Sequence, residues 1–430
     1  MKTERLTRAL NSRAARKFRR SRLAMLAMAV ILVYVSIGLW LSAADVFADL
    51  TGNRGFDDGR TTLFTAFTLD RVDARVGPLR ARGWLEAPTG EDRARNIKYY
   101  LDRFSKALRL SDPAERREAL ESLRFAERRA AVTGSEQSIA NLQADVSAIS
   151  AGYRELDAFE DLDTAPQAVP ILDRLEQQVD ALFMPLTGWE RGVYTFRLAF
   201  GTDRQGRSIS ARALYSIKVA LQIGVIVGLV SVLAGALLGA VAGYFSGWAD
   251  QAVQWLYSTL SSVPDLVLLA VLAYMFTGTL FDDPSRPFIS LIPVYAAMCM
   301  TFWIGPCRVI RGEVMKIKEL EYAQAATVIG FSRSYILLRH VLPNTMHLMF
   351  INFSLLFIAA IKFEVVLSFL NLGVKAGPSW GRMISESTQE VINGNFWQIS
   401  AATLLMFFLV LAFNIVSDAL QDAFDPKHVG

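Results

Sequence analysis

Few residue types in this sequence are arranged to do chemistry. The three histidines, His340, His347 and His428, are too scattered for a metal site, and Cys299 and Cys307 fall in one apolar run, where they build neither a zinc site nor a disulfide framework. No Gly-Lys pair occurs in the sequence, so the chain lacks the phosphate loop that cradles ATP. We therefore predict no catalytic residues and no cofactor or metal in this chain.

Three charged residues lie inside apolar stretches: Asp265 next to Pro264, and Lys362 close to Glu364. A charge inside a membrane is costly unless it faces a cavity or finds a partner, so these residues are candidates for a polar pathway. Alternatively they hold helices together, or reach toward the lipid headgroups. Lys362 and Glu364 are two residues apart on a helix and need not pair with each other.

Those charges are carried by stretches long enough to cross a bilayer, which needs about 20 apolar residues per helix. Six such stretches run near residues 23–44, 217–245, 252–276, 288–307, 345–370 and 396–417. The first is longer than the usual apolar core of a signal peptide, the alternative for that segment. We expect an all-α, polytopic membrane protein with about six transmembrane helices.

Basic residues predict the orientation. Nine Lys and Arg precede residue 23, and the segments assigned to the inside carry sixteen in all against three in the short outer loops. This asymmetry places both termini in the cytoplasm of a multi-pass protein. A basic N-terminus can also bind nucleic acid, but no nucleic-acid-binding module accompanies it, so we expect the lipid bilayer and no nucleic acid as a partner.

The long polar segment between the first two stretches, residues 45–200, is predicted to lie outside the cytoplasm. Ile97, Tyr100, Leu101, Phe104 and Leu108 repeat at helical spacing, Asp112-Pro113 starts another helix, and further helical patterns cover about 136–160 and 168–183. We expect a helical insertion that acts either as a spacer packed on the membrane domain or as a docking surface for a partner or substrate.

An inner loop, residues 312–344, is predicted to form a helix-turn-helix. An Ala-rich helix is stopped by Gly330, restarted with Ser332 as N-cap, and ended at Pro343. Small residues at 323, 325 and 326 allow close approach to another surface, with Tyr322 and Ile329 as an apolar edge. The loop suits either a partner's groove or, as an amphipathic helix, the lipid surface.

This loop resembles the EAA motif of ABC-importer permeases. The resemblance implies that it docks into a separate nucleotide-binding subunit and transmits ATP-driven closure to the membrane helices. The residues at the positions of the motif are Glu321, Tyr322, Ala323, Gln324, Ala325, Ala326, Gly330, Leu342 and Pro343. Gln324 stands where the motif usually has Glu, which affects one contact with the ATPase.

Three further segments resemble permeases of the dipeptide, oligopeptide and nickel class, and the second permease of the pair in particular. Residues 201–215 resemble the GTDxxGRD…R…Y segment through Gly201, Thr202, Asp203, Gly206 and Arg207, with Ser208 in place of the usual Asp. Residues 368–381 resemble an outer SFLGLG…PSWG loop ending at Trp380-Gly381, and residues 410–426 resemble the family's carboxyl-terminal segment. Trp380 and Trp397 are expected to anchor at the outer membrane interface.

The resemblance implies a bacterial inner-membrane permease organised as a basic N-terminus (1–22), a first transmembrane helix (23–44), the insertion (45–200) and a permease core (201–428). It also implies three kinds of partner: a second permease, ABC ATPase subunits that bind ATP and Mg, and an extracytoplasmic substrate-binding protein. The substrate would be a peptide or a related small solute. The alternatives are a mechanotransmitting membrane protein, or a sensor with an outer ligand-binding domain.

Overall fold

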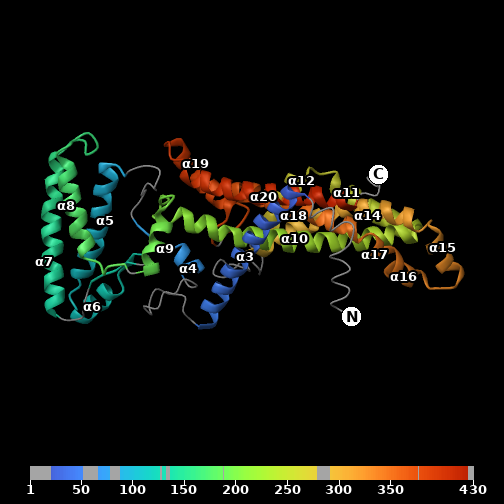
Figure 1. The fold of residues 1–430 in the computed structure, drawn as a ribbon, viewed down its shortest axis with the longest axis horizontal. Coiled ribbons are helices and arrows are strands. Elements are labelled where there is room, and N and C mark those ends of the chain that lie inside the picture. Colours follow the sequence, from blue (N-terminus) through green and yellow to red (C-terminus); the bar gives the residue numbers. More distant parts are fainter. Residues whose placement is uncertain are drawn as a thin grey trace. The chain divides into compact units, whose positions relative to one another are not determined.

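The computed structural model describes residues 21–51, 66–77, 88–125, 128–131, 136–186, 188–277, 291–375 and 377–424, and most of them are helical (Figure 1). The chain divides into two compact units. The core unit comprises Met1–Gly38, Ile217–Ser385 and Thr403–Gly430, and the insertion unit comprises Leu39–Ser216 and Glu386–Ala402. Residues 1–20 and 288–290 lie outside the described residues. The sequence assigns the first range to the basic N-terminus and the second to the fourth apolar stretch.

Five helical segments in the described part of the chain are long and apolar enough to cross a membrane. They are α3 (Arg22–Thr51), α10 (Ile209–Phe245), α13 with α14 (Ile292–Phe302 and Ile304–Ile317), α18 (Met346–Phe369) and α20 (Trp397–Phe424). Each overlaps a predicted apolar stretch. Such a stretch is expected to be helical because a helix satisfies its own backbone hydrogen bonds where no water is present.

The predicted span over 252–276 is not one straight helix. It consists of α11 (Gly247–Ser261) and α12 (Asp265–Phe276), which meet at an angle of 90°. Pro264 explains the break, since it has no N–H to donate and disfavours helical geometry at the preceding residue. The described residues therefore contain five candidate spans, or six if the bent pair counts as one.

Close packing in the core unit depends on glycines of α10. A Cβ atom at Gly239 would lie 2.5 Å from the backbone oxygen of Cys307 in α14, and one at Gly235 would lie 2.5 Å from the oxygen of Trp303. On the same helix, a Cβ at Gly224 would lie 2.5 Å from the Phe357 ring of α18. Small residues at these positions let helix backbones approach, as is common in membrane interiors.

Polar contacts fasten the bent pair to α14. Arg311 binds Asp250 of α11 through two hydrogen bonds of 2.5 and 2.7 Å. One turn earlier, Arg308 donates to Ser261 at 2.9 Å and lies 4.7 Å from the centre of the Tyr257 ring. A planar guanidinium suits such a two-point contact with a carboxylate.

The insertion unit contains a small helical bundle with its own apolar core. Helices α5 (Gly90–Leu108), α7 (Glu136–Tyr153) and α8 (Ala168–Ala181) pack together around Phe104, Leu172 and Leu175, all fully buried (Figure 1). The bundle also includes α6 (Pro113–Glu121), the short helix η1 (Arg154–Ala158) and the two-residue strands β1 (Arg124–Phe125) and β2 (Arg128–Arg129). Thr89 and Asp112 cap α5 and α6 with their side chains, so the predicted helices are present.

Replacing Gly239 with Leu should separate α10 from α14, because the new Cβ would meet a carbonyl oxygen that cannot move away alone. Overpacking of this kind costs about 1–3 kcal/mol. We expect a lower melting temperature in detergent, measured by intrinsic fluorescence. Gly312→Leu is the control, since a Cβ there meets nothing within 4 Å, and equal melting temperatures for the two variants would contradict this account of the packing.

Candidate functional site

The inner loop has the turn that its sequence predicts. Helix α15 (Glu321–Val328) ends before Gly330, which has a φ of +94°, a conformation that L-residues with a side chain rarely adopt. Helix α16 (Arg333–Ile336) then begins, and the Ser332 hydroxyl caps it by accepting a hydrogen bond from the Tyr335 N–H at 3.3 Å. The predicted helix-turn-helix is confirmed over this stretch.

The prediction that Pro343 ends the second helix is wrong. The chain continues through a π-helical turn, η3 (Leu337–Val341), and the short α17 (Leu342–Asn344) into α18. Pro343 lies in the first turn of α17, where a missing N–H leaves no helical hydrogen bond unmade. The loop therefore continues almost directly into the membrane helix α18.

The loop has a buried face and an exposed face. Ala326, Ile336 and Val341 are buried against residues of α10 and α14: Ala236, Ala240, Ile310, Val314 and Ile317. Val328 is 87% exposed and Ile329 is 73% exposed, and Phe331 and Tyr335, also exposed, stack on each other. We call Val328, Ile329, Phe331 and Tyr335 the docking face.

Two small residues do not lie where close approach to a partner would need them. Ala323 and Ala326 are buried within the chain, at 2% and 7% exposure, so their size serves the loop's own packing. Ala325, Glu321 and Gln324 are exposed. The Gln324 amide donates to the backbone oxygen of Glu319 at 3.1 Å, and the Tyr322 hydroxyl accepts from Asn344 at 2.6 Å.

A second site forms where the GTD segment meets α19 (Trp380–Ile392), within the insertion unit. Arg207 and Arg212 both donate to the same Asp203 oxygen at 2.7 Å, and both reach one Glu386 oxygen, at 2.8 and 2.9 Å. Arg212 and Asp203 are almost fully buried. Asp73 lies 3.6 Å from Arg212 as a third anion, and Glu386, at 29% exposure, is only half-buried. The buried charges of Arg212 and Asp203 depend on each other, because removing one partner of a buried ion pair leaves an uncompensated charge.

Glycines and main-chain contacts hold this cluster in place. Gly201 and Gly206 each have a φ of +76°, and Asp203 accepts hydrogen bonds from the N–H groups of Gln205 and Arg207 at 2.9 Å. The backbones of Thr202 and Ser208 pair in an isolated antiparallel β-bridge. These conformations explain the Gly residues of the GTD segment, and the structure brings Asp203 and Arg207 together.

Arg212 is the Arg of the GTDxxGRD…R…Y resemblance but was given no role, and the sequence did not single out Glu386 or Glu390 at all. Glu386 and Glu390 lie one helical turn apart after Trp380-Gly381, and an i, i+4 pair of carboxylates facing a basic segment is the signal that could have revealed them. Glu390 accepts a hydrogen bond from the Arg204 N–H at 3.1 Å, and burial raises the pKa of its carboxyl group.

The three pathway candidates are not brought together. Glu364 is buried and accepts a hydrogen bond from Ser368 at 2.7 Å, whereas Lys362 is exposed. A Cβ atom on Gly381 would lie 3.2 Å from a Glu364 oxygen, so the PSWG segment covers this carboxylate. The position of Glu364 favours the helix-holding alternative, and a pathway role for these residues stays a prediction.

Two further placements differ from expectation. Asp265 is the first residue of α12 and is exposed, because the helix breaks at Pro264. Trp380 is 1% exposed, so the prediction that it anchors at a membrane interface is wrong: its ring is part of the packed interior of the PSWG segment.

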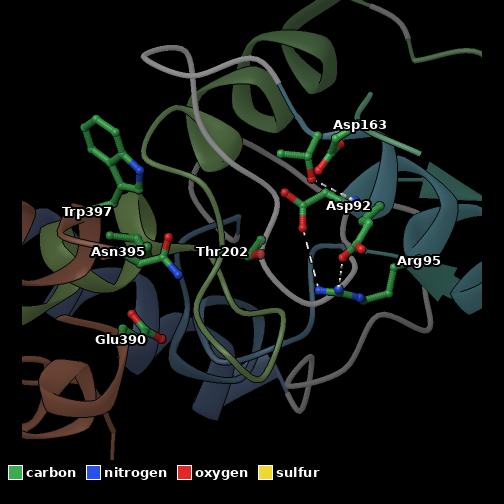
Figure 2. A pocket seen from close by; sticks show the side chains of 10 residues that line it. Asp92, Arg95, Asp163, Thr202, Glu390, Asn395 and Trp397 are labelled. Atoms are coloured by element: carbon green, nitrogen blue, oxygen red, sulfur yellow. Dashed lines mark hydrogen bonds and ion pairs between the residues drawn. The ribbon is translucent and has the colours of Figure 1, made fainter. Parts of the chain in front are cut away.

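An acidic pocket of about 170 Å³ lies in the insertion unit (Figure 2). Asp92, Asp163, Glu91 and Glu390 contribute carboxylates to its lining, and Thr202, Asn395 and Trp397 complete it on the side of Glu390. The one cation, Arg95, lies 3.6 Å from Asp92 and 3.7 Å from Glu91. In the part of the chain that the structure describes, no group of three or more His, Cys, Asp or Glu residues could hold a metal ion.

Replacing Arg212 with Met should destabilise the insertion unit, since the buried Asp203 loses one of its two cations and Glu386 and Asp73 lose a partner. Breaking a buried ion pair costs about 3–5 kcal/mol. Arg117→Met is the control: its pair with Glu121 is about half exposed on both sides and is worth about 0–1 kcal/mol. Denaturant titration of both variants measures the difference, and equal midpoints would refute a structural role for the cluster.

Comparison with known proteins identifies the family. Residues 235–429 match the model of the binding-protein-dependent transport system inner membrane component. The dipeptide transport system permease protein DppC of Bacillus subtilis is 34% identical over 53% of this chain and 68% of its own length. The oligopeptide permease OppC of Escherichia coli K12 is 35% identical over 53% and 72%. The glutathione permease GsiD of Escherichia coli O6:K15:H31 is 33% identical over 54% and 73%.

All of these relatives are transport permeases, which favours the importer prediction over the sensor and mechanotransmitting alternatives. Their shared family, the apolar helices and the two-faced loop agree on a multi-pass membrane protein with a transport role. This chain is therefore a member of the binding-protein-dependent transport permeases, a transmembrane subunit of an ABC importer of the dipeptide and oligopeptide class.

Proposed function

We propose that this permease carries peptides or related small solutes into a bacterial cell, driven by ATPase subunits that dock on the loop 312–344. The observation that carries the proposal is the loop's division into a buried and an exposed face. The substrate class rests on the relatives, which are permeases for dipeptides, oligopeptides and glutathione.

The docking face has the chemistry of a protein interface. Val328 and Ile329 are exposed by 87% and 73%, and two stacked aromatic rings, Phe331 and Tyr335, with centroids 5.1 Å apart, extend the apolar surface. Apolar side chains that cluster on a surface mark a site of association, and aromatic residues are enriched in such sites. A groove in an ATPase subunit would cover them.

The buried face connects that partner to the membrane helices. Ile336 and Val341 are fully buried in a cluster with Ile310 and Val314 of α14 and Ala240 of α10. Packed interiors have low compressibility, so a displacement of α15 and α16 is passed to α10 and α14 rather than absorbed. Alternating access would then proceed by rigid movement of helices that are already in contact.

The energy source would be external to this chain. Its sequence contains no phosphate loop, so ATP and Mg would be bound by the partner ATPases, and we assign no enzymatic activity or cofactor to the permease itself. A second permease would complete the pathway, and an extracytoplasmic binding protein would deliver substrate. The family's description as binding-protein-dependent supports the last of these partners.

We place both termini and the loop 312–344 in the cytoplasm, and the insertion outside. The proposal rests on the basic residues of the N-terminus and of the segment from Arg308 to Arg339, compared with few in the short segments on the other side. The same orientation brings the docking face to the compartment that contains ATP.

Affinity purification of the tagged chain from its native membrane, followed by mass spectrometry, tests the proposal. We expect an ATPase with a phosphate loop and a second permease. Val328→Glu should reduce recovery of the ATPase about tenfold, because a charge would be buried at the interface. Val169→Glu, at an exposed site of α8, is the matched control. Reproducible recovery of the chain alone in several detergents, or full recovery of the ATPase with Val328→Glu, would refute the proposal.

Gly330→Val should uncouple ATP hydrolysis from uptake. A β-branched residue at a φ of +94° costs about 1–3 kcal/mol and would change the turn that orients α16. We expect uptake to fall at least tenfold in reconstituted vesicles while the complex still hydrolyses ATP. Gly312→Val is the control, since Gly312 lies inside α14 with open space around its Cβ position. Normal uptake by Gly330→Val would rule out this role of the turn.

A further inference from the structure

A second pocket, of about 160 Å³, lies in the insertion unit and is lined by residues of α5, β2, α8 and α9 (Gly188–Leu198). It is distinct from the acidic pocket and shares no lining residue with it. One water molecule needs about 10–15 Å³, so this pocket has room for more than a single water. Pockets for whole ligands begin at about 300 Å³, so it is smaller than those. A pocket of this size suits one side chain with its adjoining backbone group.

Arg128 supplies hydrogen-bond donors in a fixed position. Its guanidinium donates to Asp180 at 2.5 Å and lies 4.2 Å from the centre of the Phe183 ring, which hold it in place. A guanidinium has five N–H donors. Within the described part of the chain, Asp180 and Tyr194 are the groups that hydrogen-bond to it, so donors remain for an acceptor in the pocket.

Asn96 supplies a hydrogen-bond acceptor. Its Oδ1 atom is buried and, among the described residues, has no hydrogen-bond partner. Asn96 lines the same pocket as Arg128. A buried polar atom without a partner is unfavourable by about 1–3 kcal/mol, and a ligand that donates an N–H to it would remove that penalty.

The charges of the pocket are already paired within the protein. Arg128 binds Asp180, and the third charged lining residue, Glu176, receives two hydrogen bonds from Arg93, at 2.8 and 2.9 Å. A ligand carboxylate would therefore lie near two acidic residues, and an ammonium group would lie near Arg128. Neither charge is favoured, because a charge that loses its water needs an unpaired opposite charge.

The remaining lining combines apolar side chains with the phenol rings of Tyr100 and Tyr194, whose hydroxyl groups hydrogen-bond to each other. Ile97, Val179 and Leu198 form the apolar walls. A Cβ atom at Gly77, which also lines the pocket, would meet nothing within 4 Å. An aliphatic side chain would fit against these walls while its backbone group meets Asn96 and Arg128.

We infer that the insertion binds an uncharged peptide unit bearing an aliphatic side chain, whose amide N–H donates to Asn96 and whose carbonyl oxygen accepts from Arg128. The insertion is thus a recognition element and not only a spacer. The inference rests on the proposed peptide substrate for its ligand class.

The test uses four probes on the whole purified chain in nanodiscs, with binding followed by ligand-observed NMR. N-acetyl-leucinamide is neutral, N-acetyl-leucine carries a carboxylate, leucinamide carries an ammonium group, and leucine carries both. We expect the neutral probe to bind at least tenfold more tightly than each of the others. Absence of binding by every probe, or tighter binding of a charged one, would overturn the inference.

Three variants locate the binding. Asn96→Leu keeps a similar volume and removes the acceptor, and we expect about tenfold weaker binding of N-acetyl-leucinamide. Gly77→Leu should fill the pocket and abolish detectable binding without backbone strain. Gly192→Leu is the matched control, since its Cβ also meets nothing within 4 Å but it does not line the pocket. Unchanged binding by both Asn96→Leu and Gly77→Leu would place the ligand elsewhere.

This binding measurement is independent of uptake. If the chain binds the neutral probe but recovers no ATPase from the membrane, the proposed transport function fails and the pocket stands. If it recovers the ATPase and transports peptides while no probe binds, the pocket assignment alone is refuted.

Discussion

Water is absent from the interior of a bilayer, and this constraint organises the core unit. Every backbone polar group there must be paired within the chain, which selects helices. Because lipid tails are as apolar as the side chains, helices are held together by close contact instead of by exclusion of water. Gly235 and Gly239 allow that contact, since the backbone oxygens of Trp303 and Cys307 lie 2.5 Å from where their Cβ atoms would be. Arg311 meets this constraint differently, by pairing with Asp250 of α11.

Close contact also decides how force can travel from the loop 312–344. A loosely packed connection would absorb a small displacement, but Ile336 and Val341 are packed without exposed surface against α10 and α14. The π-helical turn at Leu337–Val341 continues the chain into α18 despite Pro343. π-turns are frequently found at functional sites in helices. The loop is thus connected to α14 and α18 through the chain, and it also packs against α10 and α14.

Local signals in the sequence predicted local structure well. Apolar runs located the membrane helices, Gly330 and Ser332 located a turn and a cap, and the spacing of Ile97, Leu101 and Phe104 located a helix of the insertion. Hydropathy could not show the bend at Pro264, because it reports composition and not backbone geometry. The ion cluster was missed for another reason: Glu386 lies far along the chain from Asp203 and Arg212, and only the tertiary fold brings them together. The direction of Ala323 and Ala326 in a short helix was likewise set by tertiary packing.

The two units meet different physical demands. In the insertion unit, the bundle of α5, α7 and α8 buries its own apolar core, centred on Phe104, Leu172 and Leu175, so its folding does not require lipid. Its surface ion pairs, such as Arg117 with Glu121, are exposed and contribute little to stability. Residues lining its pockets can therefore change with little effect on the glycine contacts or on the loop 312–344. Under the proposed function, the solute site in this bundle and the packing of the loop 312–344 depend on different residues, so one can change without the other.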